Sequence, residues 1–94
     1  MQVEVLLPGV LADEAGGRRS VSVELPDGAD LATLLDRLEA GHPRLVRRIR
    51  DETGALRRYV NVYLGEDDVR ARGGPAAVIV PGVVVSVLPS VAGG

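Results

Sequence analysis

The sequence predicts an α+β fold in which one main helix covers one face of a mixed sheet of four to five strands. Four runs alternate apolar with polar residues, as half-buried strands do: Gln2–Leu7, Arg19–Leu25, Arg58–Leu64 and Val83–Leu88. A fifth run, Asp30–Ala40, repeats its leucines at helical spacing. The chain has 94 residues, of which 46% are hydrophobic, so its length suits one domain around one core.

The first two alternating runs form a predicted hairpin. Val3 and Val5 share one face of the first run, and Val21 and Val23 share one face of the second. Between them lies Leu11–Gly17, which we interpret as a polar turn because it ends in two glycines.

The helix that follows has start and stop signals. Asp30 occupies the N-cap position, where its carboxylate accepts hydrogen bonds from free amides and is favoured by the helix dipole. Gly41 suits the residue after the last turn, and Pro43 prevents extension. The apolar stripe consists of Leu31, Leu34, Leu35 and Leu38. A second, shorter helix is expected at Pro43–Arg50.

The second half of the chain adds the remaining strands. A loop at Asp51–Leu56 precedes the third run, Val69-Arg70 is expected to add a short strand, and Ala76–Val80 is expected to form one helical turn. Pro89 is expected to end the last strand, since proline cannot donate to a ladder. We therefore expect a domain at residues 1–88 and a flexible tail at residues 89–94.

This order of elements defines a topology. A hairpin, a crossover helix and further strands in fewer than 100 residues are typical of the β-grasp fold. The first and last strands are then parallel neighbours at the centre of the sheet. Their nearly continuous apolar character fits burial on both sides.

The composition excludes several kinds of chemistry in this chain. It has no Cys, which excludes disulfides, thiolate metal sites and a thiol nucleophile, and all eleven of its cations are Arg. His42 is the only histidine and has no partner at ligand spacing, so we expect it to face solvent and expect no metal site. No apolar run has the length of a membrane span and no export signal is visible, so we expect a cytoplasmic protein without membrane contact.

Positive charge is concentrated in residues 42–58. The net charge is −2, yet this segment holds Arg44, Arg47, Arg48, Arg50, Arg57 and Arg58. Two interpretations remain open, a solvated helix face with local ion pairs and a docking site for an acidic partner. Nucleic-acid binding is disfavoured by the negative net charge and by the lack of interleaved aromatic residues.

The end of the sequence carries its most informative motif. Gly93-Gly94 presents a carboxylate with no side chain near it, so it fits a channel too narrow for any side chain. The pair closes a terminal block, Val85–Gly94. Together with the strand Arg58–Leu64, which continues into Gly65–Arg70, this block resembles the ThiS/MoaD family of ubiquitin-like sulfur carriers. Within that family it is most similar to the actinobacterial cysteine-biosynthesis carriers of the CysO type.

The resemblance implies a function. In this family a partner adenylates the C-terminal carboxylate with ATP and a sulfur donor converts it to a thiocarboxylate. The reacting residue here is then Gly94, and the tail that threads into partners is Pro89, Ser90, Val91, Ala92 and Gly93. The implied partners are a ubiquitin-activating-like adenylyltransferase/sulfurtransferase and a pyridoxal-phosphate-dependent synthase or other sulfur acceptor. The chain is then a protein co-substrate with no bound cofactor, and not an enzyme.

Partners of such a carrier must also recognise its folded body. We expect the docking surface on the sheet face opposite the helix, with Val84, Ser86 and Leu88 beside Asn61 and Tyr63. Three alternatives stay open from the sequence: the small subunit of molybdopterin synthase, a ubiquitin-like protein modifier, and an interaction module with an inert tail.

Overall fold

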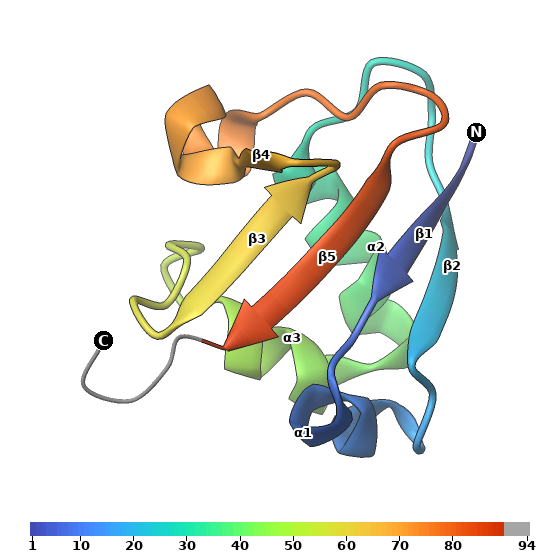
Figure 1. The fold of residues 1–94 in the computed structure, drawn as a ribbon, viewed down its shortest axis with the longest axis vertical. Helices are drawn as coiled ribbons and strands as arrows, with labels where there is room; N and C mark the ends of the chain where they lie inside the picture. Colours follow the sequence, from blue (N-terminus) through green and yellow to red (C-terminus); the bar gives the residue numbers. More distant parts are fainter. Residues whose placement is uncertain (90–94) are drawn as a thin grey trace.

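The computed structural model describes residues 1–89 and contains one mixed sheet in the strand order β2-β1-β5-β3-β4 (Figure 1). The α+β, β-grasp arrangement predicted from the sequence is therefore confirmed. The strands are β1 (Gln2–Leu6), β2 (Ser20–Glu24), β3 (Val60–Leu64), β4 (Asp67–Asp68) and β5 (Val84–Pro89). Compared with expectation, β5 starts and ends one residue later, and Pro89 is its last residue.

The two central strands come from opposite ends of the described chain. β1 pairs with β5 in parallel, with Val5 opposite Val85, while β1–β2, β5–β3 and β3–β4 are antiparallel. The predicted parallel neighbours are confirmed. Val3 and Val87 share the buried face with this central pair. A strand paired on both sides keeps every backbone group satisfied, which suits β5 to the centre.

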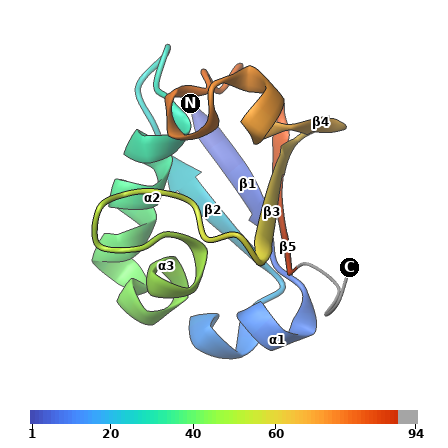
Figure 2. The same ribbon diagram turned by 90° about the vertical axis from the view of Figure 1, so that its left-hand side faces the viewer.

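The helices pack against one face of the sheet (Figure 2). α2 (Leu31–Gly41) and α3 (Pro43–Ile49) form near their predicted positions, but Gly41, expected after the last turn of α2, is its last residue and has no positive φ. They bury a stripe made of Leu31, Leu34, Leu35, Leu38, Leu45, Val46 and Ile49. All buried residues within positions 1–89 are hydrophobic, so the core is aliphatic and contains no titratable side chain. Over the same range, no helix is long and apolar enough to cross a membrane.

The expectation of a polar turn at Leu11–Gly17 was wrong. This segment, together with the two residues before it, contains α1 (Gly9–Ala12) and a 3-10 turn, η1 (Asp13–Ala15). Leu11, Ala12 and Ala15 are buried, and their i, i+1, i+4 spacing is a short helical pattern. Gly16, with φ of 70°, then ends the turn.

Two expectations between β3 and β5 were also wrong. Val69-Arg70 is not a strand but starts a 3-10 helix, η2 (Val69–Arg72), because Asp68 Oδ1 accepts the Arg70 amide at 2.9 Å. The helical turn expected at 76–80 lies earlier, at η3 (Gly74–Ala76).

The segment after η3 is extended because it bonds to a distant part of the chain. The Leu31 amide donates to the Ala77 carbonyl and the Ile79 amide to the Ala29 carbonyl, both at 2.9 Å. Ala77 and Ile79 are buried, whereas Val78 is exposed. Long-range bonding therefore prevents a local helix here, and it joins this segment to the start of α2.

The predicted N-cap of α2 is confirmed. Asp30 Oδ1 accepts from the Thr33 amide at 2.9 Å and from the Thr33 hydroxyl at 2.8 Å. These two bonds hold the pKa of the Asp30 carboxyl below its ordinary value of 3.8. The charged carboxylate is thus the form that caps the helix.

Replacing this cap should give a pH-dependent loss of stability. Asp30→Ala is expected to lower the free energy of unfolding by about 1 kcal/mol at neutral pH. Because the folded-state pKa is depressed, the carboxylate contributes fully above pH 3.8 and loses its contribution as the pH falls through the folded value. Urea unfolding of both proteins should show the difference shrinking below that pH. A difference that persists unchanged in acid would contradict this account, and Asp27→Ala, in the exposed preceding turn, is the control.

Candidate functional site

The sheet face opposite the helices is open. Along β5, Val85 and Val87 point into the core, so Val84, Ser86 and Leu88 lie on the open face. Across the ladder, Tyr63 lies opposite Ser86 and Asn61 lies opposite Leu88. The structure therefore brings all five of the docking residues expected from the sequence onto one continuous surface. Their role in docking stays a prediction.

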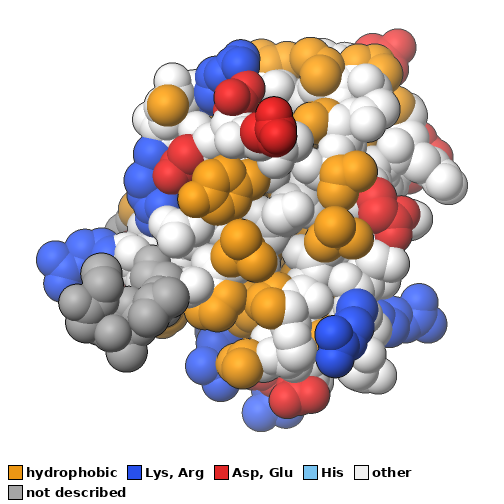
Figure 3. Space-filling view, in the orientation of Figure 1, with side chains coloured by type: hydrophobic (Ala, Val, Ile, Leu, Met, Phe, Trp, Pro, Cys, Tyr) orange, Lys and Arg blue, Asp and Glu red, His pale blue; other side chains and the backbone are white. Residues whose placement is uncertain are grey.

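An apolar patch runs across this face, over β1, β5 and β3 (Figure 3). Val84 is 38% exposed and Leu88 is 44% exposed, with the half-buried Tyr63 alongside. Leu6 on β1, 42% exposed, lies opposite Ser86 and belongs to the same surface, although it was not expected there. We call Leu6, Tyr63, Val84 and Leu88 the open-face patch. Exposed large side chains clustered in this way are typical of protein-binding surfaces.

A carboxylate borders the open-face patch on the β1–β2 side. Glu4 lies opposite Val84 and accepts a hydrogen bond from the Ser22 hydroxyl at 3.0 Å. Hydrogen bonds from Ser20 and Ser22 lower the pKa of the Glu4 carboxyl. The patch thus has a charged rim at this edge, which is common at protein interfaces.

On the β3 side the surface is held by Arg70 of η2. Its guanidinium donates to Asn61 Oδ1 at 3.1 Å, to the Arg57 carbonyl at 2.9 Å and to the Val60 carbonyl at 2.8 Å. One side chain thus joins η2 to the start of β3 and orients Asn61 beside Leu88. No local pattern in the sequence indicated Arg70, because two of its partners are backbone carbonyls.

Loss of Arg70 should loosen this edge of the sheet. Arg70→Ala is expected to lower the free energy of unfolding by about 1–2 kcal/mol, since bonds from a charged donor are strong but this one is partly exposed. Arg72→Ala, on the same turn, removes only a surface ion pair with Asp67 and should change stability by less than about 0.5 kcal/mol. Thermal or urea unfolding measures both. Equal effects of the two variants would contradict the anchoring role.

The predicted tail begins where the described structure ends. Pro89 lies opposite Val60 at the carboxyl end of the central strand, one residue beyond Leu88. Ser90, Val91, Ala92, Gly93 and Gly94 lie outside the described residues, so their roles stay predictions. The open-face patch is therefore continuous with the strand that leads into them.

His42, which we expected to face solvent, is half-buried where α2 meets α3. Among residues 1–89, no group of three His, Asp or Glu side chains is placed to hold a metal ion. The described part of the chain offers surfaces for binding, and its buried groups are apolar.

The mixed five-stranded sheet with helices on one face places the protein in the ubiquitin-like β-grasp class. Comparison with known proteins narrows this class: the ThiS family model matches residues 5–94, and the chain belongs to the ThiS family.

Relatives of known structure agree with this assignment. The sulfur carrier protein CysO of Mycobacterium tuberculosis is 40% identical over the full length of both chains. Its crystal structure matches with a TM-score of 0.84 at 37% identity, covering 95% of this chain and 99% of that one. CysO in the BexX/CysO complex of Amycolatopsis orientalis matches with a TM-score of 0.85 at 36% identity, covering 98% and 99%. The small archaeal modifier protein 1 of Haloferax volcanii matches with a TM-score of 0.81 at 27% identity, covering 96% and 98%.

Proposed function

We propose that this protein is a sulfur carrier whose reacting group is the carboxylate of Gly94. The observation that carries the proposal is full-length similarity, at 40% identity, to a protein named as a sulfur carrier, together with a family match that extends through the Gly93-Gly94 pair. The open-face patch supports it, because a carrier must be held by other proteins while its end reacts.

The chemistry follows from the weakness of a free carboxylate as an electrophile. A partner enzyme first joins the Gly94 carboxylate to the α-phosphate of ATP, which releases pyrophosphate and leaves an acyl-adenylate. A sulfur nucleophile then attacks the acyl carbon and AMP departs, so that a C–S bond replaces the C–O bond to AMP. This chain has no Cys to supply the sulfur, so the donor belongs to a partner. The protein is thus a substrate in these steps, and ATP is bound by the activating enzyme.

The thiocarboxylate then donates its sulfur to an acceptor enzyme. Similarity to CysO favours cysteine biosynthesis, with a pyridoxal-phosphate-dependent synthase as acceptor. The relative from Amycolatopsis orientalis is named in a complex with BexX, so sulfur carriers of this type associate with other proteins. In our proposal both partners hold the open-face patch while the tail enters their active sites.

Intact-mass spectrometry tests the central step. After incubation with its activating enzyme, ATP and a sulfur donor, the protein should gain the mass difference between one sulfur and one oxygen atom. A variant with one residue added after Gly94 should remain unmodified, because the added side chain and carboxylate displace the reacting group. Failure of the native protein to acquire sulfur, or equal modification of the extended variant, would exclude the proposal.

The docking role of the open face has its own test. Val84→Ser/Leu88→Ser should raise the KM of the activating enzyme for the carrier by about 5- to 30-fold, since apolar anchors at an interface centre carry much of its binding energy. The rate at saturating carrier should stay unchanged. Val10→Ser alters a side chain that is 68% exposed on α1 and serves as control. If the KM of Val84→Ser/Leu88→Ser equals that of the native protein, docking does not use the open-face patch.

A second candidate, a ubiquitin-like protein modifier, is favoured by the similarity to the small archaeal modifier protein. In that case the Gly94 acyl group would form isopeptide bonds with lysines of other proteins. Affinity-tagged protein isolated from cells would then carry conjugates of higher mass, whereas a sulfur carrier alone would not.

A further inference from the structure

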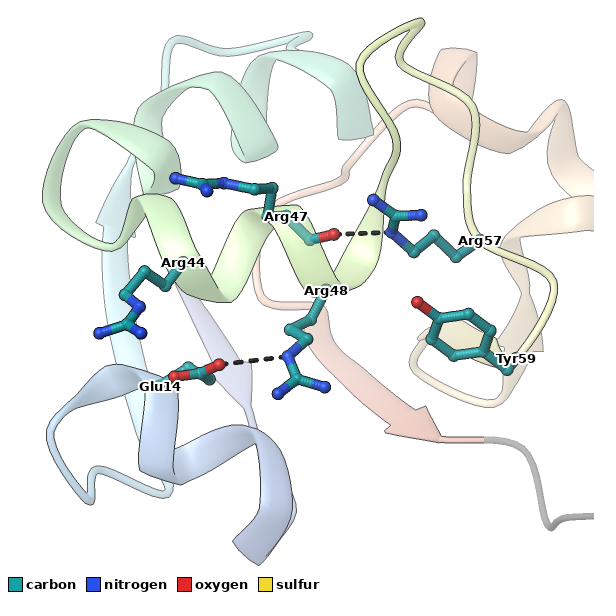
Figure 4. Close-up of a pocket in the computed structure, with 6 residues that line it drawn as sticks. All are labelled: Glu14, Arg44, Arg47, Arg48, Arg57 and Tyr59. Carbon is teal, nitrogen blue, oxygen red and sulfur yellow. Dashed lines mark hydrogen bonds and ion pairs between the residues drawn. The ribbon is translucent and has the colours of Figure 1, made fainter.

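A second surface lies on the helix side of the molecule, away from the open face. It is a pocket of about 310 Å³ between α3, η1 and the segment that leads into β3 (Figure 4). Four arginines, one tyrosine and one glutamate line it: Glu14, Arg44, Arg47, Arg48, Arg57 and Tyr59. We call this the basic pocket.

Positive charge in the basic pocket is only partly neutralised. Arg48 pairs with Glu14 at 3.1 Å, and Arg44 extends from α3 toward the same glutamate (Figure 4). The Arg57 guanidinium is held by a hydrogen bond from its Nε to the Arg47 carbonyl at 2.7 Å. Within residues 1–89, neither Arg44 nor Arg47 forms an ion pair with an acid.

Arg50, which directly follows α3, differs from the arginines of the basic pocket because two acids neutralise it. Its guanidinium pairs with Asp36 at 2.7 Å and with Glu39 at 2.9 Å, both on α2. The basic pocket has four arginines for one glutamate, in a protein whose net charge is −2. Clustered like charges repel one another, so this excess of positive charge favours binding of a negatively charged group.

The basic pocket borders the end of the central strand. Tyr59 directly precedes Val60, and Val60 lies opposite Pro89, the last described residue. The hydroxyl of Tyr59 faces back toward α3 (Figure 4). An enzyme that receives the residues after Pro89 therefore comes within reach of this pocket as well as of the open-face patch.

We propose that the basic pocket docks an acidic segment of the enzyme that receives the C-terminal residues; this rests on the proposed carrier function. Guanidinium groups bind carboxylates through paired hydrogen bonds, so several Asp or Glu side chains on one segment complement Arg44, Arg48 and Arg57. A protein segment is favoured over nucleic acid because Tyr59 is the only aromatic residue here and the chain is acidic as a whole. A partner that binds both the open-face patch and the basic pocket would hold the carrier on both sides of β5.

Association kinetics with the purified activating enzyme test this proposal. Arg44→Ala/Arg48→Ala should slow association about 10-fold at low ionic strength, and the difference should fade in high salt. Arg37→Ala/Arg72→Ala removes the same charge from exposed sites outside the pocket and should change association by less than about 2-fold. Circular dichroism checks that both variants are folded. Equal slowing by the two variants, or none by either, would overturn the proposal.

A measurement independent of sulfur transfer separates this proposal from the proposed function. Titration of the ¹⁵N-labelled full chain with a short polyglutamate peptide should shift the resonances of Arg44, Arg48 and Tyr59 most strongly. These shifts should be lost in Arg44→Ala/Arg48→Ala and kept in Arg37→Ala/Arg72→Ala. Tighter binding of short polyuridylate RNA than of the peptide, or shifts confined to other surfaces, would overturn the acidic-segment assignment. If the peptide binds but intact-mass spectrometry detects no sulfur at Gly94, the docking surface is retained and the carrier function is excluded.

Discussion

Glu4–Leu6 and Val84–Ser86, at opposite ends of the described chain, pair in parallel at the centre of the sheet. With β5 in that position, its alternating side chains must fill the core on one face and form the open face on the other. Val85 and Val87 are buried in the core, while Val84 and Leu88 are exposed on the open face. The pairing of β5 with β3 places Pro89 opposite Val60, which directly follows Tyr59 of the basic pocket. The buried and the exposed side chains of β5 thus both follow from one strand pair.

Local sequence patterns were enough to predict the elements whose burial and capping follow from neighbouring residues. Alternation of valines predicted four strands, and an aspartate before a leucine stripe predicted the cap and the buried face of α2. Two-residue periodicity also predicted which side of β5 and β3 is open. Leu6 was missed as a member of the open-face patch, although the predicted parallel pairing of the first and last strands already places it next to β5.

The wrong prediction at residues 76–80 arose where long-range interactions override local preference. Residues 77–80 are extended because their backbone groups bond to Ala29 and Leu31, which are remote in sequence. Arg70 anchors the start of β3 through carbonyl groups, which have no sequence signature. The α1 helix is short and its apolar residues are few, so its signal is weaker than that of the glycines that follow it. For residues 77–80 and for Arg70, the decisive partner is identified only once the chain is folded.

The order in which the strands are made has a consequence for biogenesis. β5 is the last of the five described strands to leave the ribosome, and until it does so β1 and β3 each present an unpaired edge of valine-rich backbone. A nascent or truncated chain is therefore prone to edge-to-edge aggregation and to proteolysis, because its central strand is missing. Cooperative folding of the sheet therefore waits for β5, the strand that completes its centre.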